Sequence, residues 1–418
     1  MSNLKNLWKH YLVSALTVVI ILIFATPVNA FAGKMLSIEE YELERIILNA
    51  EQGYTQAQHQ LGWLFETGIG KEQCYDQAAY WYRKSAEQGF NLAKISLGLL
   101  YSQGFGVEKD YVVSAYWFRK AAEQGCYIAQ NMMAGIYHCG YGVEQSHEKS
   151  VYWRRQAAKQ GYDHAQNALG KMYFAGTGIE QNFKQAEYWF RQAAAQGLIN
   201  AKHNLGVMYQ QGLSVEQDFE QALYWYRLAA KHGSVVSMVN LGWMYRRGLG
   251  VEQNYEQAVY FYRIAAYHGD DVGKANLGFM YYNGHGVNQS YEKAAYWNRR
   301  AAVMGHVYAP SNLGLLYFQG LGVEQDYELA AYWLRISAER GNPEAQTNIA
   351  VMYRDGLGVA QSSQLATYWI NRRDAEQGCA QAQYRLAEIY RLGLGVTQDY
   401  ERAAHWYSLA AEQGHVML

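Results

Sequence analysis

The chain has few prolines, few cysteines and almost no net charge. Its 418 residues include only 3 prolines, and because proline interrupts helices, the sequence favours long helical stretches. The formal net charge is −1, and charged residues make up 17% of the chain. Such a chain creates no overall field that would attract nucleic acid or an anionic membrane, so we expect no nucleic-acid partner.

The 4 cysteines do not have the spacing of a disulfide framework. Cys126 and Cys139 stand 13 residues apart at opposite ends of one predicted helix. That separation is about 20 Å, whereas a bridge requires Cα atoms within about 7 Å. No two cysteines, including Cys74 and Cys379, share an equivalent position in adjacent units of the repeat described below. We therefore expect free thiols.

Metal and cofactor motifs are also missing. The 12 histidines include no His-x-x-x-His pair with a nearby carboxylate. His232 and His268 stand at equivalent positions 36 residues apart, and we interpret them as a coincidental pair. The Gly-x-Gly motifs follow predicted helices rather than strands, so they are not dinucleotide loops. The sequence predicts no metal site, no cofactor and no enzyme.

Glycine recurs eleven times at the end of a motif close to Ala-Glu-Gln-Gly. Every interval is 36 residues, except that from Gly341 to Gly378, which is 37. A fixed period of this size is typical of a solenoid, in which each unit packs only against its neighbours. We therefore predict an all-α solenoid of about ten units. The repeating glycines are Gly53, Gly89, Gly125, Gly161, Gly197, Gly233, Gly269, Gly305, Gly341, Gly378 and Gly414.

The segment after Gly233 shows the pattern of one unit. A helix, here named helix A, is predicted over about 236–247, because its apolar residues form one stripe. Gly248 is predicted to end this helix as a C-cap, and Gly242 inside it to permit a close backbone approach. A connector then leads to helix B, which is preceded in most units by Asp, Asn or Ser, the preferred N-cap types. The unit is an αα-hairpin.

The repeated pattern resembles a known family. It reads Leu-Gly-x-x-Tyr-x-x-Gly-x-Gly-Val, then Asp-Tyr-x-x-Ala-x-x-Trp-Tyr-x-x-Ala-Ala-Glu-Gln-Gly, and it is similar to the Sel-one-like repeat, a relative of the tetratricopeptide repeat. The resemblance covers Gly53 to Gly414. It implies a right-handed superhelix of antiparallel helix pairs, with helix A on the concave face, that acts as an adaptor for protein complexes. Similar exported bacterial proteins act in cell-envelope assembly, signalling and contacts with host cells.

The N-terminal residues have the layout of a secretory signal peptide. Lys5 and Lys9 precede an uncharged apolar run over 11–25, which is shorter than the roughly 20 residues of a bilayer span. We predict cleavage after Ala30, or alternatively after Ala32, and an uncleaved membrane anchor stays open. We expect a periplasmic or secreted protein. The predicted organisation is a signal peptide over 1–30, an N-terminal capping helix over 31–52, ten repeats over 53–414 and a tail over 415–418.

Five consecutive units carry asparagine at one position of helix A. An asparagine amide both donates and accepts, so a ladder of them is suited to holding the main chain of an extended peptide. The resemblance supports this interpretation, because peptide-binding tetratricopeptide domains use asparagine at the matching position. The alternatives are a hydrogen bond to a neighbouring helix and a consensus preference without a ligand. The ladder consists of Asn204, Asn240, Asn276, Asn312 and Asn348.

Aromatic and arginine residues follow on the same face of helix A. Such residues are enriched among the anchors of protein interfaces, and here they suit a protein or peptide partner with some acidic character. The alternative is a solvated arginine face. The row consists of Trp243, Arg246, Phe279, Tyr282, Phe318, Arg354 and Arg391.

One motif suggests catalysis. Ser146 with Lys149, and Ser290 with Lys293, match the Ser-x-x-Lys motif of serine β-lactamases. Both serines stand where other units carry the N-cap residue of helix B, and the companion motifs are absent, so we interpret them as caps. A β-lactamase-like or peptidoglycan-active hydrolase of the cell envelope is the alternative function.

We therefore predict a non-enzymatic exported scaffold that binds a protein or peptide through the helix A surface. The last predicted helix, over about 400–413, leaves Tyr400, Trp406 and Tyr407 on or near an open end, which suggests self-association or a partner there. The extra residue of the ninth unit lies near Asn371, as a π-bulge or as a local misregister without function.

Overall fold

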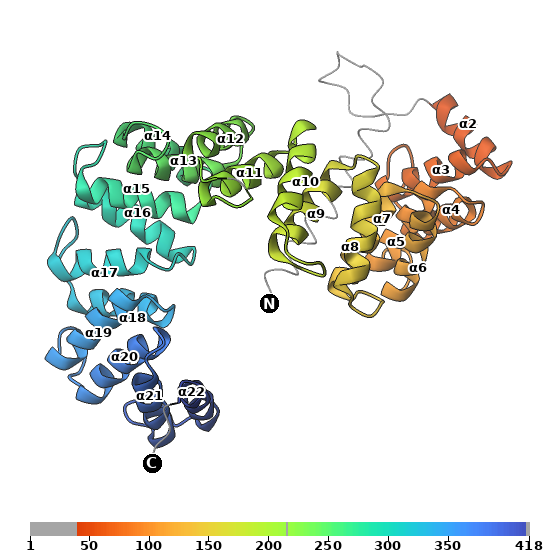
Figure 1. Ribbon diagram of the computed structural model, residues 1–418. Helices are drawn as coiled ribbons and strands as arrows, with labels where there is room; N and C mark the ends of the chain where they lie inside the picture. Colours follow the sequence, from red (N-terminus) through yellow and green to blue (C-terminus); the bar gives the residue numbers. More distant parts are fainter. Residues whose placement is uncertain (1–39, 215, 415–418) are drawn as a thin grey trace. The chain divides into compact units, whose positions relative to one another are not determined.

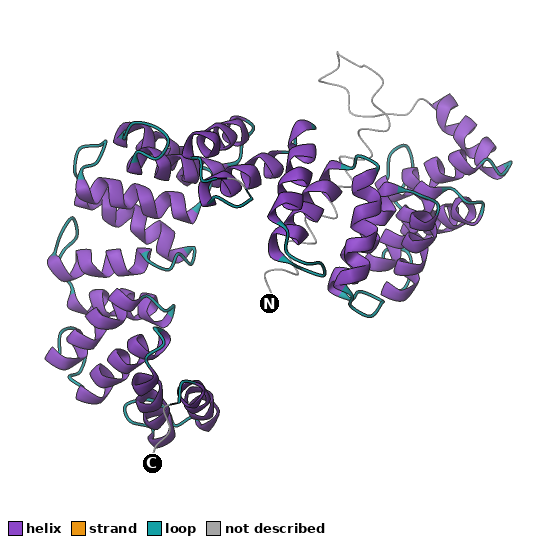
Figure 2. Cartoon of the chain, in the orientation of Figure 1, coloured by secondary structure: helices purple, strands orange, loops and turns teal. Residues whose placement is uncertain are grey.

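The computed structural model describes residues 40–214 and 216–414. These residues form twenty-one helices joined by loops, and no strand occurs among them (Figure 2). Odd-numbered helices from α3 onward are helix A of a unit, and even-numbered helices from α4 onward are helix B (Figure 1). This arrangement is the predicted all-α solenoid of αα-hairpins. The chain divides into two compact units, one ending at Ala157 and the other beginning at Ala158.

The first of the two compact parts of the chain begins with α2, which precedes the first hairpin. The division between the units falls inside α8, the helix B of the third hairpin. The helices are α2 (Glu40–Glu51), α3 (Thr55–Thr67), α4 (Tyr75–Glu87), α5 (Asn91–Gln103), α6 (Tyr111–Glu123), α7 (Tyr127–Cys139) and α8 (His147–Lys159).

The second compact part of the chain continues the alternation of helix A and helix B. Its helices are α9 (Asp163–Ala175), α10 (Phe183–Ala195), α11 (Ile199–Gln211), α12 (Phe219–Lys231), α13 (Val235–Arg247), α14 (Tyr255–Tyr267), α15 (Asp271–Asn283), α16 (Tyr291–Val303), α17 (Ala309–Gln319), α18 (Tyr327–Glu339), α19 (Pro343–Asp355), α20 (Ser363–Glu376), α21 (Ala380–Leu392) and α22 (Tyr400–Glu412).

The core lies between consecutive helices. Leu241 and Met244 of α13 pack with Tyr226 of α12, and all three are fully buried. Burial of one such side chain contributes about 1.5–3 kcal/mol. Gly242 lets α14 approach α13, because a Cβ at this position would stand 2.6 Å from the ring of Tyr262. The close contact at Gly242 is therefore with a side-chain ring of the partner helix and not, as predicted, with its backbone.

The helix ends follow the predicted chemistry. Gly248 adopts a left-handed conformation with φ of 70° after α13, and its N–H donates to the carbonyl of Met244. Asn254 begins α14 by accepting from the N–H of Gln257 at 2.9 Å. The predicted C-caps and N-caps are confirmed, and the same side-chain cap precedes α6, α10, α12, α16, α18, α20 and α22.

Within the hairpins, two helices depart from the standard length of 13 residues. α20 has 14 residues and is α-helical throughout, so the extra residue does not form a π-bulge. It changes which side chains face inward: Tyr368 is 6% exposed, whereas Tyr332 of α18 is 47% exposed. α17 has 11 residues. Pro310 is the second residue of α17, within the first turn, where its missing N–H costs no intrahelical hydrogen bond.

One connector lacks its second glycine. Gly250 has a φ of 65°, and a Cβ there would stand 2.4 Å from the backbone of Phe219. Ser214 takes the equivalent position after α11 with a φ of 67°, the one positive φ of a non-glycine residue among those described. Its hydroxyl donates to Glu187 at 2.8 Å. A side chain is thus accommodated in a conformation that favours glycine.

The four cysteines, Cys74, Cys126, Cys139 and Cys379, are free thiols, as predicted. Among the residues described here, no helix combines the length and the apolar character needed to cross a bilayer. The predicted signal peptide over 1–30 and the tail over 415–418 lie outside the described residues.

Candidate functional site

The five asparagines of the predicted ladder are all half-buried on helix A. Three of them bond to a neighbouring helix. The amide of Asn204 donates to Asn167 at 2.9 Å, and that of Asn312 donates to Asn298 at 3.3 Å. Asn240 hydrogen-bonds the phenol of Tyr226. These contacts match the first alternative interpretation of the ladder.

The other two asparagines have no such bond to a neighbouring helix among the described residues. Asn276 donates to the carbonyl of Val272 in its own helix at 2.9 Å, and Asn348 is half-buried in α19. An amide offers two N–H donors and an acceptor, so one internal bond leaves capacity for a ligand. Peptide binding by the ladder therefore stays a prediction, now restricted to the groups that these internal bonds leave unused.

The row of aromatic and arginine residues divides into three kinds of environment. Tyr282 and Phe318 pack edge-on against the first tyrosine of a helix B, with ring centroids 5.4 and 5.2 Å apart from Tyr291 and Tyr327 respectively. Trp243 is half-buried beside the core of α12 and α13. These three aromatic side chains support the hairpins, and each keeps only part of its surface available.

Arg354 and Arg391 are exposed and already neutralised. Arg354 forms two hydrogen bonds with Asp355, at 2.7 and 2.8 Å. Arg391 pairs with Glu388 at 2.5 Å. A partner's carboxylate would have to displace these internal acids, so the two arginines are weak candidates for recognition of an acidic segment.

Arg246 is different, because none of the acidic side chains that the structure describes pairs with it. Its guanidinium lies over the ring of Phe279 in α15, 5.0 Å from the ring centroid, so the structure brings these two predicted residues together. No carboxylate forms an ion pair with Arg246 within the described residues, and its buried Nε has no hydrogen-bond partner there. The guanidinium is thus held in place while part of its donor capacity stays unused.

Tyr262 of α14 lies next to this arginine. Its side chain is fully buried, and its hydroxyl has no hydrogen-bond partner in the described part of the chain. Burial raises the pKa of the Tyr262 phenol to about 12, against the opposing charges of Arg246 and Arg247. The phenol therefore keeps its proton at neutral pH and acts as a donor.

We name Arg246, Tyr262, Phe279 and His285 the Arg246 cluster. His285 follows α15, lies edge-on to Phe279 with centroids 6.2 Å apart, and stacks on Tyr255 at 4.4 Å. Its buried Nδ1 has no partner within the described residues. Sequence reasoning missed Tyr262 and His285. Tyr262 could have been found by comparing units, because its equivalents Tyr82 and Tyr226 face Glu66 and Gln210, where this unit has arginine.

The Ser-x-x-Lys motifs are helix caps, as predicted. The hydroxyls of Ser146 and Ser290 accept from the backbone N–H of Lys149 at 3.2 Å and of Lys293 at 3.3 Å. The amine of Lys149 lies over the ring of Tyr137, and that of Lys293 over an equivalent ring. The amines are therefore engaged with aromatic rings, and neither is hydrogen-bonded to its serine as the base of a nucleophile would be.

Metal chemistry finds no support in the described residues. No group of three or more His, Cys, Asp or Glu side chains there is arranged to hold an ion. The exposed His232, which directly follows α12, hydrogen-bonds the carbonyl of Leu228 in the last turn of that helix at 2.8 Å.

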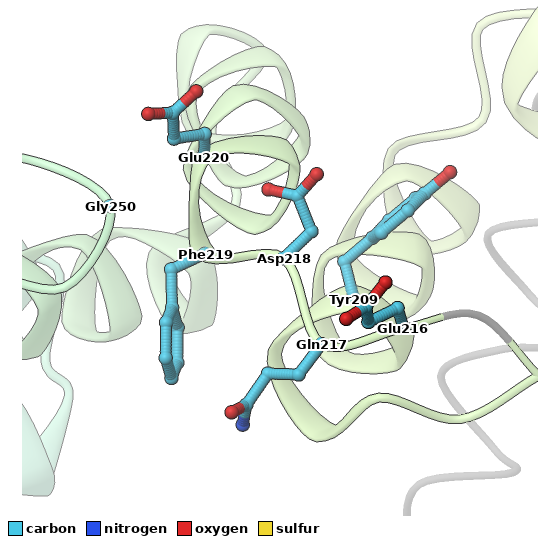
Figure 3. Close-up of a pocket in the computed structure, with 7 residues that line it drawn as sticks. All are labelled: Tyr209, Glu216, Gln217, Asp218, Phe219, Glu220 and Gly250. Carbon is cyan, nitrogen blue, oxygen red and sulfur yellow. The ribbon is translucent and has the colours of Figure 1, made fainter.

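A surface hollow of about 550 Å³ lies at the start of α12 (Figure 3). Glu216, Asp218 and Glu220 contribute carboxylates to its lining. Asp218 is engaged as the N-cap of α12, and it accepts from the N–H of Gln221 at 2.9 Å. Figure 3 shows the Asp218 and Glu220 carboxylates on the opposite side of the chain from the Phe219 ring, so the lining groups do not converge on one point.

The last helix, α22, is less open than predicted. Tyr400 is 66% exposed. Trp406 and Tyr407 are half-buried, because Trp406 packs on the core of the preceding units and the Tyr407 hydroxyl donates to Glu388. Of the three aromatic residues predicted near an open end, only Tyr400 presents most of its surface.

Comparisons with known proteins agree with this architecture. A family model described as Sel1 repeat, the Sel-one-like repeat named above, matches ten segments of the chain. They are 55–90, 91–126, 128–162, 163–198, 199–234, 235–270, 272–306, 308–342, 343–372 and 380–415. A search of curated proteins gave no match.

Two solved structures are similar over most of their length. A protective antigen present in uropathogenic Escherichia coli strains, described as displaying an SLR fold, is 33% identical with a TM-score of 0.64, over 89% of this chain and 87% of that one. A Sel1 repeat protein from Oxalobacter formigenes is 30% identical with a TM-score of 0.63, over 79% of this chain and 99% of that one. Since the repeats match in sequence and the helices pair as those repeats require, the chain belongs to the Sel1 repeat family.

Proposed function

We propose that this chain is an exported, non-enzymatic scaffold that binds a protein or peptide through the helix A surface. Ten tandem Sel1 repeats carry the proposal. Sel1-repeat proteins typically act as protein-interaction scaffolds, and solenoids of this kind are generally non-catalytic. An array of hairpins offers a long surface on which each unit adds a few side chains, which suits an extended protein segment.

The helix A surface of α11, α13, α15 and α17 supports this site best. It combines four half-buried asparagine amides with an arginine that pairs with no acid in the part of the chain that the structure describes. Aromatic and arginine side chains are the usual anchors of protein interfaces, and Phe279 beside Arg246 supplies one of each. The neighbouring amides would bond the main chain of the segment that these anchors hold.

Export is part of the proposal. The layout of residues 1–30 supports a secretory signal, and the likeness to a protective antigen of uropathogenic Escherichia coli is in keeping with a place in the cell envelope or beyond it. A role in envelope assembly, signalling or contact with host cells would follow. Sequencing the N-terminus of the protein recovered from its native host tests this: a start after Ala30 or Ala32 supports export, and an intact Met1 opposes cleavage.

Crosslinking in the native envelope tests partner binding. The full chain is compared with the triple variant Asn240→Ala/Asn276→Ala/Asn312→Ala. We expect the amount of the main crosslinked adduct to fall by about tenfold, since removal of an interface anchor costs about 1–2 kcal/mol. Circular dichroism and thermal unfolding of the purified variant establish that it is folded.

The matched control changes the other helix of the same units. Glu256, Glu292 and Glu328 are exposed at equivalent positions of helix B, and their triple alanine variant should leave the adduct unchanged. An adduct that survives the asparagine changes and is lost with the glutamate changes would place the binding surface on helix B and contradict the proposal.

Self-association through α22 is a separate proposal, supported by the exposure of Tyr400. Sedimentation equilibrium of the purified chain and of Tyr400→Ser tests it. A concentration-dependent dimer that the substitution weakens supports it, and a monomer at all concentrations contradicts it.

A further inference from the structure

We propose that Arg246 and Tyr262 form a carboxylate-binding site that takes an acidic side chain of the protein partner. The inference rests on the proposed function, because it names the chemistry of the partner that the helix A surface would bind. It concerns a single unit, the sixth repeat, and one neighbouring side chain of the seventh, Phe279.

Two unused donors with no internal acceptor carry the inference. The hydroxyl of Tyr262 and the Nε of Arg246 are both buried, and neither has a hydrogen-bond partner in the described residues. Tyr262 is fully buried, so an unmade bond at its hydroxyl is costly, about 1–3 kcal/mol. Arginine has five donors and no acceptor, so Arg246 cannot satisfy the tyrosine proton. The site lacks an acceptor oxygen, and because both donor atoms are buried, a ligand reaches them only by displacing the side chains that cover them.

Equivalent tyrosine–acceptor pairs in two other repeats show which kind of group the Tyr262 hydroxyl lacks. Tyr82 donates to the carboxylate of Glu66, and Tyr226 donates to the amide oxygen of Gln210 at 2.7 Å. Each pair joins helix B to helix A of the same unit, across the same 16-residue separation. In the sixth repeat the acceptor is replaced by Arg246, so a bond that the first and fifth repeats make internally is left for a ligand to complete.

The charge of the site selects a negative acceptor. Arg246 and Arg247 both act on the Tyr262 phenol, and neither forms an ion pair with a carboxylate in the described part of the chain. Hydrogen bonds between a guanidinium and a carboxylate are roughly twice as strong as neutral ones. A carboxylate would therefore be favoured over a neutral amide or over water.

The neighbouring ring prepares the arginine for binding. The guanidinium of Arg246 lies 5.0 Å from the centroid of Phe279, and this ring is 37% exposed. An arginine stacked on an aromatic ring loses less side-chain freedom when it binds an anion. The exposed part of Phe279 offers apolar contact to the side-chain stem of the bound residue.

Fluorescence anisotropy with a labelled octaglutamate peptide tests the site in the purified full chain. Arg246→Gln should weaken binding by about tenfold or more, because it removes the charge, and Tyr262→Phe by about threefold, because it removes one donor. Arg263→Gln is the control, since Arg263 is exposed on helix B of the same unit and its loss changes the net charge equally. The control should change binding by less than about twofold.

Loss of folding would not explain the expected loss of octaglutamate binding by Arg246→Gln. Arg246→Gln recreates the pair seen at Gln210 and Tyr226, so its thermal unfolding midpoint should equal or exceed that of the wild type. Labelled octaglutamine should not bind. Equal loss of octaglutamate binding in Arg246→Gln and Arg263→Gln would mean unspecific attraction and overturn the proposal.

Inorganic phosphate distinguishes the source of the anion. If phosphate displaces octaglutamate at a concentration well below that of free glutamate, the site is a phosphate site and the inference fails. Failure here leaves the scaffold function intact, because the crosslinked adduct is measured independently. If octaglutamate binds as expected but no adduct forms, the scaffold proposal fails instead.

Discussion

The fifth and sixth repeats, residues 199–234 and 235–270, place a buried tyrosine at the same position of helix B and treat it differently. In the fifth repeat Tyr226 donates to Gln210 at 2.7 Å and also bonds Asn240 of the next unit. In the sixth repeat Tyr262 faces Arg246, and its hydroxyl has no hydrogen-bond partner among the described residues. The Tyr226 hydroxyl thus has an acceptor within its own repeat, whereas the Tyr262 hydroxyl has none among the described residues.

In the connectors, the fifth repeat is the unusual one and the sixth is the regular one. The sixth repeat has the standard Gly250, whereas the fifth has Ser214 with a φ of 67° and a hydrogen bond to Glu187. These two departures from the shared pattern therefore lie in different parts of the repeat. Departures in the connector affect how units join, and the departure at Arg246 affects what the helix A surface offers to a ligand.

Exchanging the connector residues should have the largest effect. Gly250→Ser should lower the free energy of unfolding by about 3 kcal/mol, because the new Cβ would stand 2.4 Å from the backbone of Phe219. Ser214→Gly should change it by less than about 1 kcal/mol, since relief of the positive φ offsets the lost bond to Glu187. Urea unfolding followed by circular dichroism measures both. Equal effects would show that the two connectors are interchangeable.

Alanine at the helix A glycines should have a smaller effect. At Gly206 and Gly242 a Cβ would stand 2.6 Å from the rings of Tyr226 and Tyr262 respectively. We expect Gly206→Ala to destabilise by about 2–3 kcal/mol and Gly242→Ala by about 1 kcal/mol less, because of these two tyrosines only Tyr226 has a hydrogen-bonded hydroxyl among the described residues. The same urea titration tests the difference. A larger loss at Gly242 would mean that Tyr262 is held by a bond absent from the structure.

Exchanging the polar partners should have the smallest effect, with opposite signs. Gln210→Arg should destabilise by about 1–2 kcal/mol, because Tyr226 loses its acceptor, and Arg246→Gln should stabilise by about 1 kcal/mol, because Tyr262 gains one. Thermal unfolding midpoints of the two variants check the signs. If Arg246→Gln destabilises the protein instead, the contact of Arg246 with Phe279 outweighs the unsatisfied tyrosine.

The regular part of the fold could be predicted from the sequence, because the same local chemistry occurs in every unit. The left-handed Gly248, the capping Asn254 and the crowded Gly242 each act through contacts with close neighbours or with the partner helix of one hairpin. The 36-residue period aligns these positions, so one unit explains the others. The free thiols and the caps at Ser146 and Ser290 follow from the same alignment.

The candidate site could be predicted only in part. Arg246 of α13 and Phe279 of α15 lie on the same face of their respective helices, and the structure brings them together. The role of Tyr262 depends on contacts between helix B and helix A, which a pattern along one helix does not reveal. The direction of each asparagine amide likewise depends on the neighbouring side chain, as at Asn204 and Asn276, where only one bonds to another helix.

A crystal structure of the full chain bound to octaglutamate would test the central claim most directly. We predict one glutamate carboxylate with oxygens about 2.7–3.0 Å from the hydroxyl of Tyr262 and from a guanidinium nitrogen of Arg246. A water molecule bonded to Tyr262, with the peptide bound elsewhere, would contradict the proposed site.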